Sequence, residues 1–388
     1  MVRAEGPAPA RVDPRAATPL RVLFVNENIG GHATVHNALR RCLDLRGDIE
    51  AEFLDVPDPG LLQRLGRAPV PMLGRFDLDL QPLRSQIIRS QWVGRALRAR
   101  LKVGGVDVVH VYTQNCALTS VATLGRVPCV VTTDSTTELN AYRIPYRSPT
   151  RFTPWGVRAS IPFERRVFRA ADQVIANSAY VAASLRGAYG VPERKLIVLP
   201  FGVWLPPPPA PRPRRRPCIV FVGHQLRRKG GLRLLDVHQR YLRDRCDLLL
   251  VTTENVPELP GVRVVSNLRG GSDRLYELLQ QADVMCFPSS IDQAPNVVLE
   301  GAAAGLPVVA HPVAAITEMV QDGVTGLLVP PEDDAALLAA LRSLLDNPAR
   351  AREMGRRGRQ HVEALYDMRT AVARLATVLF AVARGNKQ

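Results

Sequence analysis

The chain has 388 residues, enough for two domains of ordinary size, and its 46% hydrophobic and 22% charged residues are typical of a folded globular protein. No run of about 18 apolar residues occurs, so we expect no transmembrane segment. Residues 1–19 lack the apolar stretch of a secretory signal and are rich in Ala, Pro and Arg, which predicts a disordered tail.

The charge and the cysteines narrow the class of protein. Lys and Arg exceed Asp and Glu by 15, but the Arg residues are spread along the chain and accompany no nucleic-acid-binding motif, so we expect no nucleic-acid partner. Attraction to anionic lipids or phosphorylated substrates stays open. The six cysteines show no Cys-x-x-Cys spacing, which indicates free thiols in a reducing cytosol and disfavours a zinc site.

The first predicted unit is a strand over residues 20–26, followed by a Gly-Gly loop and a helix to about Leu45. Such a turn directs backbone N–H groups toward a bound anion, although it lacks the G-x-G-x-x-G dinucleotide pattern. His32 and His36 lie four positions apart, a spacing that can bind a metal. Because no H-E-x-x-H accompanies them, we favour His32 as a cleft residue.

Residues 57–80 contain four prolines and read as a loop. Residues 83–102 form a predicted helix with apolar residues at four-residue steps and five Arg between them. It is either a core helix with a solvated basic face or a helix that lies on an anionic membrane, and the first is favoured. Strands follow over 106–113 and 129–133. Asp134 closes the second, where the residues alone indicate an Asx-type turn at a strand end.

The rest of the first half continues the strand–helix alternation, with helices over 163–171 and 179 to about 189 and strands over 173–178 and 196–201. This alternation predicts a parallel, doubly wound sheet. Residues 205–217, rich in Pro and Arg, form the clearest domain boundary and read as a stiff linker.

A second α/β unit begins at residues 218–223, a strand that ends in Gly223, and its helix starts near Leu232. Arg228 and Lys229 lie in the turn between them, where two cations can neutralise a diphosphate, although surface Arg-Lys pairs are also common. Further strands are predicted over 247–253 and 262–267, and a further helix is predicted over 275–282.

Residues 282–330 read as strand, loop, helix and strand, with the strand at 284–287 and the helix from Asn296 to Ala304. Asp292 lies in the loop and Glu300 in the helix, eight positions apart, where a parallel sheet binds ligands. Taken singly, Asp292 could cap a turn and Glu300 could be a solvated helix residue.

The whole run resembles the donor-site signature of retaining glycosyltransferase family 4. That signature has two acids separated by seven residues, a small-residue helix, Gly-x-Pro-Val-Val, a glutamate and a Gly-x-x-Gly-x-x-Val turn. The corresponding residues here are Asp292, Glu300, Gly305–Val309, Glu318 and Gly323–Val329. The first acid is Asp rather than the commoner Glu.

The resemblance implies an α/β GT-B fold, in which two doubly wound, Rossmann-like domains face a central cleft. It assigns residues 20–204 to an acceptor domain and 218–366 to a nucleotide-sugar donor domain that ends in helices over 334–345 and 349–366. Residues 367–388 would cross back to the first domain.

The resemblance also implies residue roles. Glu300 would hold the ribose, Asp292 the donor sugar, and Arg228 and Lys229 the diphosphate. Asp134 stands where the family often has a His, and with Asp292, Glu300 and Lys229 it completes the candidate catalytic set. The other positions that it places in the cleft are Gly30, Gly31, Gly223, Asn267, Leu268, Pro295, Asn296 and Val297 at the donor, and Asn28 and His32 on the acceptor side.

The implied reaction is transfer of a sugar, with retention and without a metal, from a UDP- or GDP-sugar to a hydroxyl of a glycolipid, polysaccharide or small glycoside. No tightly bound cofactor is expected. The protein would be cytoplasmic, with contact at the inner face of an anionic membrane left open. The alternatives are another GT-B enzyme, such as an epimerase, a phosphorylase or an inverting transferase with Asp134 or His32 as base, and a non-catalytic nucleotide-sugar-binding protein.

Overall fold

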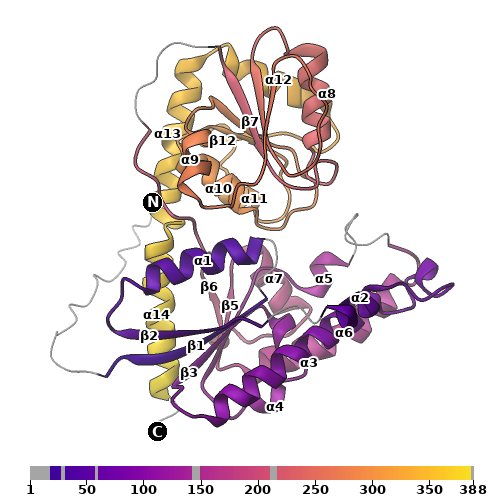
Figure 1. Ribbon diagram of the computed structural model, residues 1–388, viewed down its shortest axis with the longest axis vertical. Helices are drawn as coiled ribbons and strands as arrows, with labels where there is room; N and C mark the ends of the chain where they lie inside the picture. Colours follow the sequence, from indigo (N-terminus) through magenta and orange to yellow (C-terminus); the bar gives the residue numbers. More distant parts are fainter. Residues whose placement is uncertain (1–17, 28–30, 57–59, 142–148, 210–215, 386–388) are drawn as a thin grey trace.

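The computed structural model describes residues 18–27, 31–56, 60–141, 149–209 and 216–385. They form two six-stranded sheets, with strand orders β2-β1-β3-β4-β5-β6 and β12-β11-β10-β7-β8-β9, which Figure 1 shows as a lower and an upper body. All strand pairs within both sheets are parallel, with helices around them, so the predicted α/β class is confirmed. The predicted disordered tail lies almost wholly outside the described residues.

The first sheet is built from residues of the N-terminal half. Its strands are β1 Leu20–Asn26, β2 Ile49–Leu54, β3 Val108–Tyr112, β4 Cys129–Thr133, β5 Gln173–Ala176 and β6 Leu196–Val198. Every residue of β3 and β4 is buried, as expected for central parallel strands covered by helices on both faces. The edge strand β2 has no counterpart in the sequence prediction, because charged Glu50 and Glu52 interrupt its apolar pattern.

Two predictions for the helices of this half are wrong. The loop predicted over 57–80 contains α2 Leu61–Arg67 and the 3-10 turn η1 Gly74–Phe76. A helix this short is not stable alone, and α2 forms because Gln63 and Gly66 pack against the neighbouring helix α3. Helix α6, Thr153–Ala170, begins ten residues before the predicted start, because Pro162 lies inside it rather than at its boundary.

Helix α3, Gln81–Lys102, buries Leu83, Val93 and Leu97, so the core-packing interpretation is confirmed. Its predicted basic face is not uniformly solvated, however. Arg89 is only 5% exposed, and its Nη1 donates to the carbonyl oxygen of Glu27 at 2.9 Å. The remaining helices of this half are α1 Gly31–Leu43, α4 Val121–Leu124, α5 Thr137–Asn140 and α7 Ala179–Gly187.

The second sheet follows the predicted order except for strand β12 and helix α11, which have no counterpart in the prediction. Its strands are β7 Cys218–Val222, β8 Asp247–Val251, β9 Val262–Val265, β10 Val284–Phe287, β11 Val308–Ala310 and β12 Gly326–Leu328. Its helices are α8 Gly231–Tyr241, α9 Asp273–Leu279, α10 Asn296–Ala303, α11 Ile316–Met319, α12 Asp334–Leu345 and α13 Pro348–Leu365.

The chain passes between the two bodies twice. The two passages meet where Val203 N donates to the Tyr366 carbonyl at 2.9 Å and Met368 N donates to the Val203 carbonyl at 3.1 Å. Helix α14, Met368–Gly385, then packs on the first sheet, where Leu375 and Leu379 are fully buried in the same core as Phe24. Figure 1 shows this yellow helix running along the lower sheet.

The six cysteines are all buried and free, as predicted. Among the described residues, the structure contains no helix that is both long and apolar enough to cross a bilayer.

Candidate active site

The carboxyl end of β7 leads into a tightly packed turn before α8. A side chain at Gly223 would approach Lys229 Cδ to 2.7 Å and the Phe221 ring to 3.2 Å. Gly230 has a φ of +78°, and a side chain there would overlap the carbonyl oxygen of Pro288. The turn therefore requires glycine at both positions, and this packing fixes the backbone that carries Arg228 and Lys229.

Lys229 and Asp292 form the centre of the site on the second sheet. Lys229 Nζ lies 3.0 Å and Arg228 Nη1 lies 3.5 Å from Asp292 Oδ1, and Ser289 Oγ donates to Asp292 Oδ2 at 2.6 Å. Burial lowers the pKa of Lys229, and Asp292 partly opposes that shift. The three predicted charged residues are thus brought together, because β7 and β10 are neighbours and their carboxyl ends meet at one edge of the sheet.

Glu300 is 1% exposed on α10, so the alternative of a solvated helix residue is wrong. Neither of its carboxylate oxygens has a hydrogen-bond partner within the described residues. Burial raises the pKa of Glu300 to about 7. The backbone N–H of Gly271 lies near enough to oppose that shift, but it does not reach the geometry of a hydrogen bond to either oxygen. A buried carboxylate without a partner is costly and points to a ligand that supplies donors.

The loop between β9 and α9 lies between Glu300 and helix α1 of the first half. A Cβ on Gly270 would lie 2.9 Å from Thr34 Oγ1, on α1, and 3.5 Å from Glu300 Oε1. Of the predicted donor residues, Asn267 adopts a φ of 63° in this loop, and Leu268 packs against the hydrophobic core of the second sheet. Glu300 therefore lies near the facing surfaces of the two bodies.

The predicted residues at the start of α10 occupy its N-terminus. Pro295 is the N-cap residue, and Asn296 and Val297 form the first turn, with no side-chain cap. Their backbone follows the Asp292 loop directly. An anionic group beside Asp292 would therefore meet the positive end of the helix dipole.

A second charged cluster lies at the carboxyl edge of the first sheet. His32 Nε2 lies 2.8 Å from Asp134 Oδ2, and His32 Nδ1 lies 3.3 Å from Glu27 Oε2. Burial alone would lower the pKa of His32, but the two carboxylates raise it to about 10. Burial would likewise raise the pKa of Asp134, yet His32 holds it below its usual range. Asp134 is thus the partner of His32 at this edge, and its role as a cleft carboxylate stays a prediction.

Sequence reasoning did not single out Glu27, although an acid directly after the first strand was the available signal. It also missed the support of the loop after β4. There Glu164, 1% exposed, accepts hydrogen bonds from Gln114 Nε2 at 2.8 Å and from the Tyr189 hydroxyl, and its oxygens lie 3.2 Å from Thr137 N. This buried network fixes the backbone that carries Asp134.

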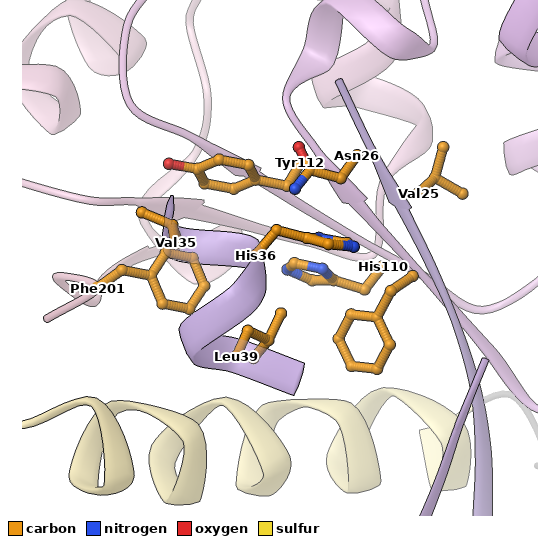
Figure 2. A pocket seen from close by; sticks show the side chains of 9 residues that line it. Val25, Asn26, Val35, His36, Leu39, His110, Tyr112 and Phe201 are labelled. Atoms are coloured by element: carbon orange, nitrogen blue, oxygen red, sulfur yellow. The ribbon is translucent and has the colours of Figure 1, made fainter. Parts of the chain in front are cut away.

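The remaining first-half predictions have different outcomes. Asn28 and Gly30 lie outside the described residues, and Gly31 begins α1. His36 does not join His32: it points into a core cavity of about 10 Å³, beside His110 and Leu39, as Figure 2 shows. Burial lowers the pKa of His36 to about 4. Within the described ranges, no group of three or more His, Cys, Asp or Glu residues could hold a metal ion.

Two polar contacts connect the facing edges of the two bodies. The Glu318 carboxylate accepts from the backbone N–H groups of Ala179 and Tyr180, at 2.8 and 2.9 Å, at the start of α7. Gln293 Nε2 donates to Asn140 Oδ1 at 3.0 Å. The residue after Asp292 is therefore in direct contact with the first half.

Comparison with known families assigns both halves. The sequence model described as Glycosyltransferase Family 4 matches residues 29–205, and that described as Glycosyl transferases group 1 matches residues 216–347. The chain belongs to glycosyltransferase family 4. The two matched regions are separated by the Pro-rich segment between the two sheets.

Curated relatives of this family-4 chain include enzymes named as synthases of glycogen and of alpha-maltose-1-phosphate. The glycogen synthase of Mycobacterium tuberculosis is 30% identical over 243 residues, which cover 58% of each chain. The alpha-maltose-1-phosphate synthase of the same species is 28% identical over 348 residues, 80% of this chain and 85% of the relative. The chain thus spans 58% of the length of the first of these relatives.

Solved structures confirm the GT-B architecture predicted for the family-4 chain. Sucrose-phosphate synthase from Thermosynechococcus elongatus has a TM-score of 0.68 at 21% identity, covering 93% of this chain and 99% of that one. Anabaena Alr3699/HepE in complex with UDP has a TM-score of 0.63 at 16% identity, covering 93% of this chain and all of that one.

Proposed function

We propose that this family-4 protein is a retaining, metal-independent glycosyltransferase that moves a hexosyl group from a nucleoside diphosphate sugar, UDP- or GDP-linked, to an acceptor hydroxyl. The observation that carries the proposal is the buried, unpartnered carboxylate of Glu300, on the same sheet edge as Lys229 and Arg228. Two adjacent ribose hydroxyls would supply the donors that Glu300 lacks.

The leaving group in this reaction is a nucleoside diphosphate. Lys229 and Arg228 would stabilise its developing charge, together with the N-terminus of α10, so protein groups take the part that a metal ion plays elsewhere. Asp292 now accepts from both cations. A bound diphosphate would take over that interaction and free Asp292 for the hydroxyls of the donor sugar.

The charge state of the His32 cluster supports retention. With a pKa of about 10, His32 is an imidazolium at neutral pH and has no free lone pair with which to act as a general base. The ionised Asp134 beside it would stabilise positive charge that develops on the donor sugar. In a retaining reaction, the departing phosphate itself would accept the acceptor proton.

Asp134 also supports the second candidate, an inverting transferase, because it is an ionised carboxylate at the facing edge of the first sheet. The two candidates differ in the product. NMR coupling constants of the new glycosidic bond would report retention or inversion directly.

The acceptor in this proposal is a glycoside or a lipid. Relatives named for glycogen and maltose-1-phosphate synthesis support a hexosyl donor and a hydroxyl acceptor. We place the reaction in the cytoplasm, since six buried free thiols suit a reducing compartment.

The test is a thermal-shift panel of UDP, GDP, TDP and ADP with their common sugar conjugates, each with Mg²⁺ and with EDTA. A ligand that binds only the folded state raises the melting temperature by mass action. We expect one nucleotide to stabilise the protein equally with and without metal.

Matched variants sharpen this test. Lys229→Ala and Glu300→Ala should each abolish the shift and the transfer reaction while circular dichroism stays unchanged. Lys102→Ala and Glu277→Ala, at exposed positions, should do neither. Normal turnover by folded Lys229→Ala and Glu300→Ala would refute the site assignment, and no shift from any nucleotide would favour a non-catalytic protein.

A further inference from the structure

Exposed apolar side chains are concentrated on one segment of the first half. Among the described residues, eight of the seventeen exposed large hydrophobic side chains lie within residues 61–78. The six most exposed are Leu61, Leu62, Leu65, Met72, Leu73 and Phe76, between 47% and 76% exposed, and we call them the apolar patch. An apolar concentration of this kind on a protein surface marks an interaction site.

The apolar patch is held in place by the structure beneath it. Gln63, 2% exposed, donates from Nε2 to Ser85 Oγ of α3 at 2.8 Å. Arg84 donates to the carbonyl oxygen of Ala68 at 3.0 Å, and Thr150 Oγ1 donates to that of Phe76 at 2.8 Å. The Gln63 side chain and the carbonyl groups of Ala68 and Phe76 thus make their hydrogen bonds within the protein, while the apolar side chains are exposed.

The basic residues of the segment are exposed, whereas its acidic residues are buried. Arg64, Arg67 and Arg75 are exposed among the apolar side chains. Asp77 is buried and accepts from Thr153 Oγ1 at 2.6 Å. Asp79 is also buried and accepts from the backbone N–H groups of Val70 and Gln81 at 3.1 and 3.2 Å. The outward face is therefore apolar and positive.

The adjoining start of α6 has the same character. The Phe152 ring contacts the Phe76 ring edge to face at 6.1 Å between centroids. One turn further along α6, Trp155 is 66% exposed between exposed Arg151 and Arg158. Trp and Arg are the side chains that favour the boundary between lipid headgroups and acyl chains. Figure 1 shows α2 and α6 together on one arm of the lower body.

The charge decides between the occupants of such a face. A second copy of the chain would bring two identical positive faces together, in a protein with a net charge of +15, and they would repel. Five of the six side chains of the apolar patch are Leu or Met, which offer no stacking platform for nucleotide bases. Apolar side chains interspersed with Arg match an anionic bilayer, which attracts the Arg and accepts the apolar groups.

We propose that residues 61–78, with Trp155, form a docking surface for an anionic lipid bilayer. This surface precedes α3, the helix whose own basic face raised the question of membrane contact from sequence. It belongs to the half to which the family resemblance assigns the acceptor. The inference does not depend on the transferase activity, since docking requires no donor.

The experiment uses the full chain and co-sedimentation with vesicles of phosphatidylcholine alone or with about 30% phosphatidylglycerol. We expect binding to the anionic vesicles only, weakened by about 0.5 M salt. Arg64→Glu/Arg67→Glu should lower the partition coefficient at least about 25-fold, roughly fivefold for each positive charge lost. Leu61→Ser/Leu65→Ser/Met72→Ser should lower it at least about tenfold.

The controls match the variants in exposure and charge. Arg350→Glu/Arg352→Glu changes two exposed Arg of α13, and Leu45→Ser/Val103→Ser/Leu365→Ser changes three exposed apolar residues elsewhere. Both should bind within about twofold of wild type. Quenching of Trp155 fluorescence by brominated lipid, with Trp155→Phe as the blank, tests insertion in the wild-type protein and requires no destabilising change.

Three outcomes would overturn the proposal. They are absence of wild-type binding to anionic vesicles, equal losses in patch and control variants, and patch variants that abolish self-association in light scattering but leave vesicle binding intact. The last would assign the face to a second copy. A failed nucleotide panel would leave this result untouched, so the two proposals fail separately.

Discussion

At the scale of single residues, Glu300 is the group whose environment has the clearest consequence. Its folded-state pKa of about 7 lies above its ordinary value of 4.5, because burial disfavours the charge. The folded protein therefore binds more protons than the unfolded chain between these values, and the stability falls as pH rises through that window.

Glu300→Gln should remove this pH dependence. We expect the variant and the wild type to be similarly stable below pH 4.5, and the variant to be more stable above pH 7 by up to about 3 kcal/mol. Urea unfolding at a series of pH values measures the difference. The same substitution should weaken nucleotide binding, since ribose hydroxyls bond better to a carboxylate than to an amide. Parallel stability profiles for the two proteins would contradict the buried charge.

His32 shows the opposite sign. Its folded-state pKa of about 10 exceeds its ordinary value of 6.5, so its ion pairs stabilise the fold fully below pH 6.5 and are lost as pH rises through about 10. This sets a second, alkaline limit on the stability of the first half.

Asp134→Asn should lower the pKa of His32 by at least about one unit, because burial continues to lower it while one carboxylate is lost. NMR titration of the imidazole, assigned with His32→Gln, measures this shift. Asp244→Asn, 88% exposed at its side chain, is the control and should change nothing. An unchanged pKa in Asp134→Asn would show that Asp134 does not hold the imidazolium.

At the scale of elements, small residues decide how the helices of the second half pack. Met285 lies against Gly301 of α10, and the backbone of Gly355 on α13 lies against the carbonyl of Gly305, at the end of α10. A side chain at either glycine would overlap these neighbours. Since α10 carries Glu300, the close packing of α13 fixes the site from behind.

Gly355→Ala should therefore destabilise the protein by about 1–3 kcal/mol, because the contact partner is backbone and cannot turn aside. Gly187→Ala is the matched control: it also lies in a helix, has no atom within 4 Å of its Cβ position, and should be neutral or stabilising. Thermal unfolding compares the two. A neutral Gly355→Ala would mean that α13 can move away from α10 freely.

At the scale of the whole molecule, one carboxylate of the second half caps a helix of the first. Glu318 accepts both N–H groups at the start of α7, where a negative charge also meets the positive end of the helix dipole. Gln293, beside Asp292, contacts Asn140 across the same boundary. The arrangement of the two sheets and the donor-side loop are thus connected.

Glu318→Ala should weaken this connection by about 1.5–3 kcal/mol, the range for hydrogen bonds to a charged group. We expect a larger radius of gyration in small-angle X-ray scattering and slower transfer, with secondary structure unchanged. Glu277→Ala, an exposed glutamate of α9, serves as the control. Identical scattering and turnover would show that other contacts hold the two bodies together.

The accuracy of the sequence predictions depended on local information. The strand at 284–287 and the helix from Asn296 were predicted to within one residue, because the apolar runs there are punctuated by Pro288, Pro295 and Gly305. Helix α2 could not be predicted, since its stability comes from packing on α3. Helix α6 was predicted to begin at residue 163, but it begins at Thr153 and contains Pro162.

For the site, the sequence could predict which acidic and basic residues of the second half matter and how far apart they lie along the chain. It could not predict that their side chains are in contact. Lys229 and Asp292 are 63 residues apart and touch only because β7 and β10 are adjacent. Glu27 was not predicted, because its role depends on contact with His32 in the folded protein. His32 also contacts Asp134, which comes from a different strand of the sheet.

The sequence by itself determined the class of fold, most strands and helices of the second half, and the residue types of the donor signature, because these depend on local periodicity, glycine and proline. Only the tertiary structure decided the charge of His32, the burial of Glu300 and the outward apolar face of residues 61–78. These three properties depend on which side chains from distant parts of the chain lie nearby and on how much water they exclude. Local sequence encodes neither the neighbours nor the exclusion of water.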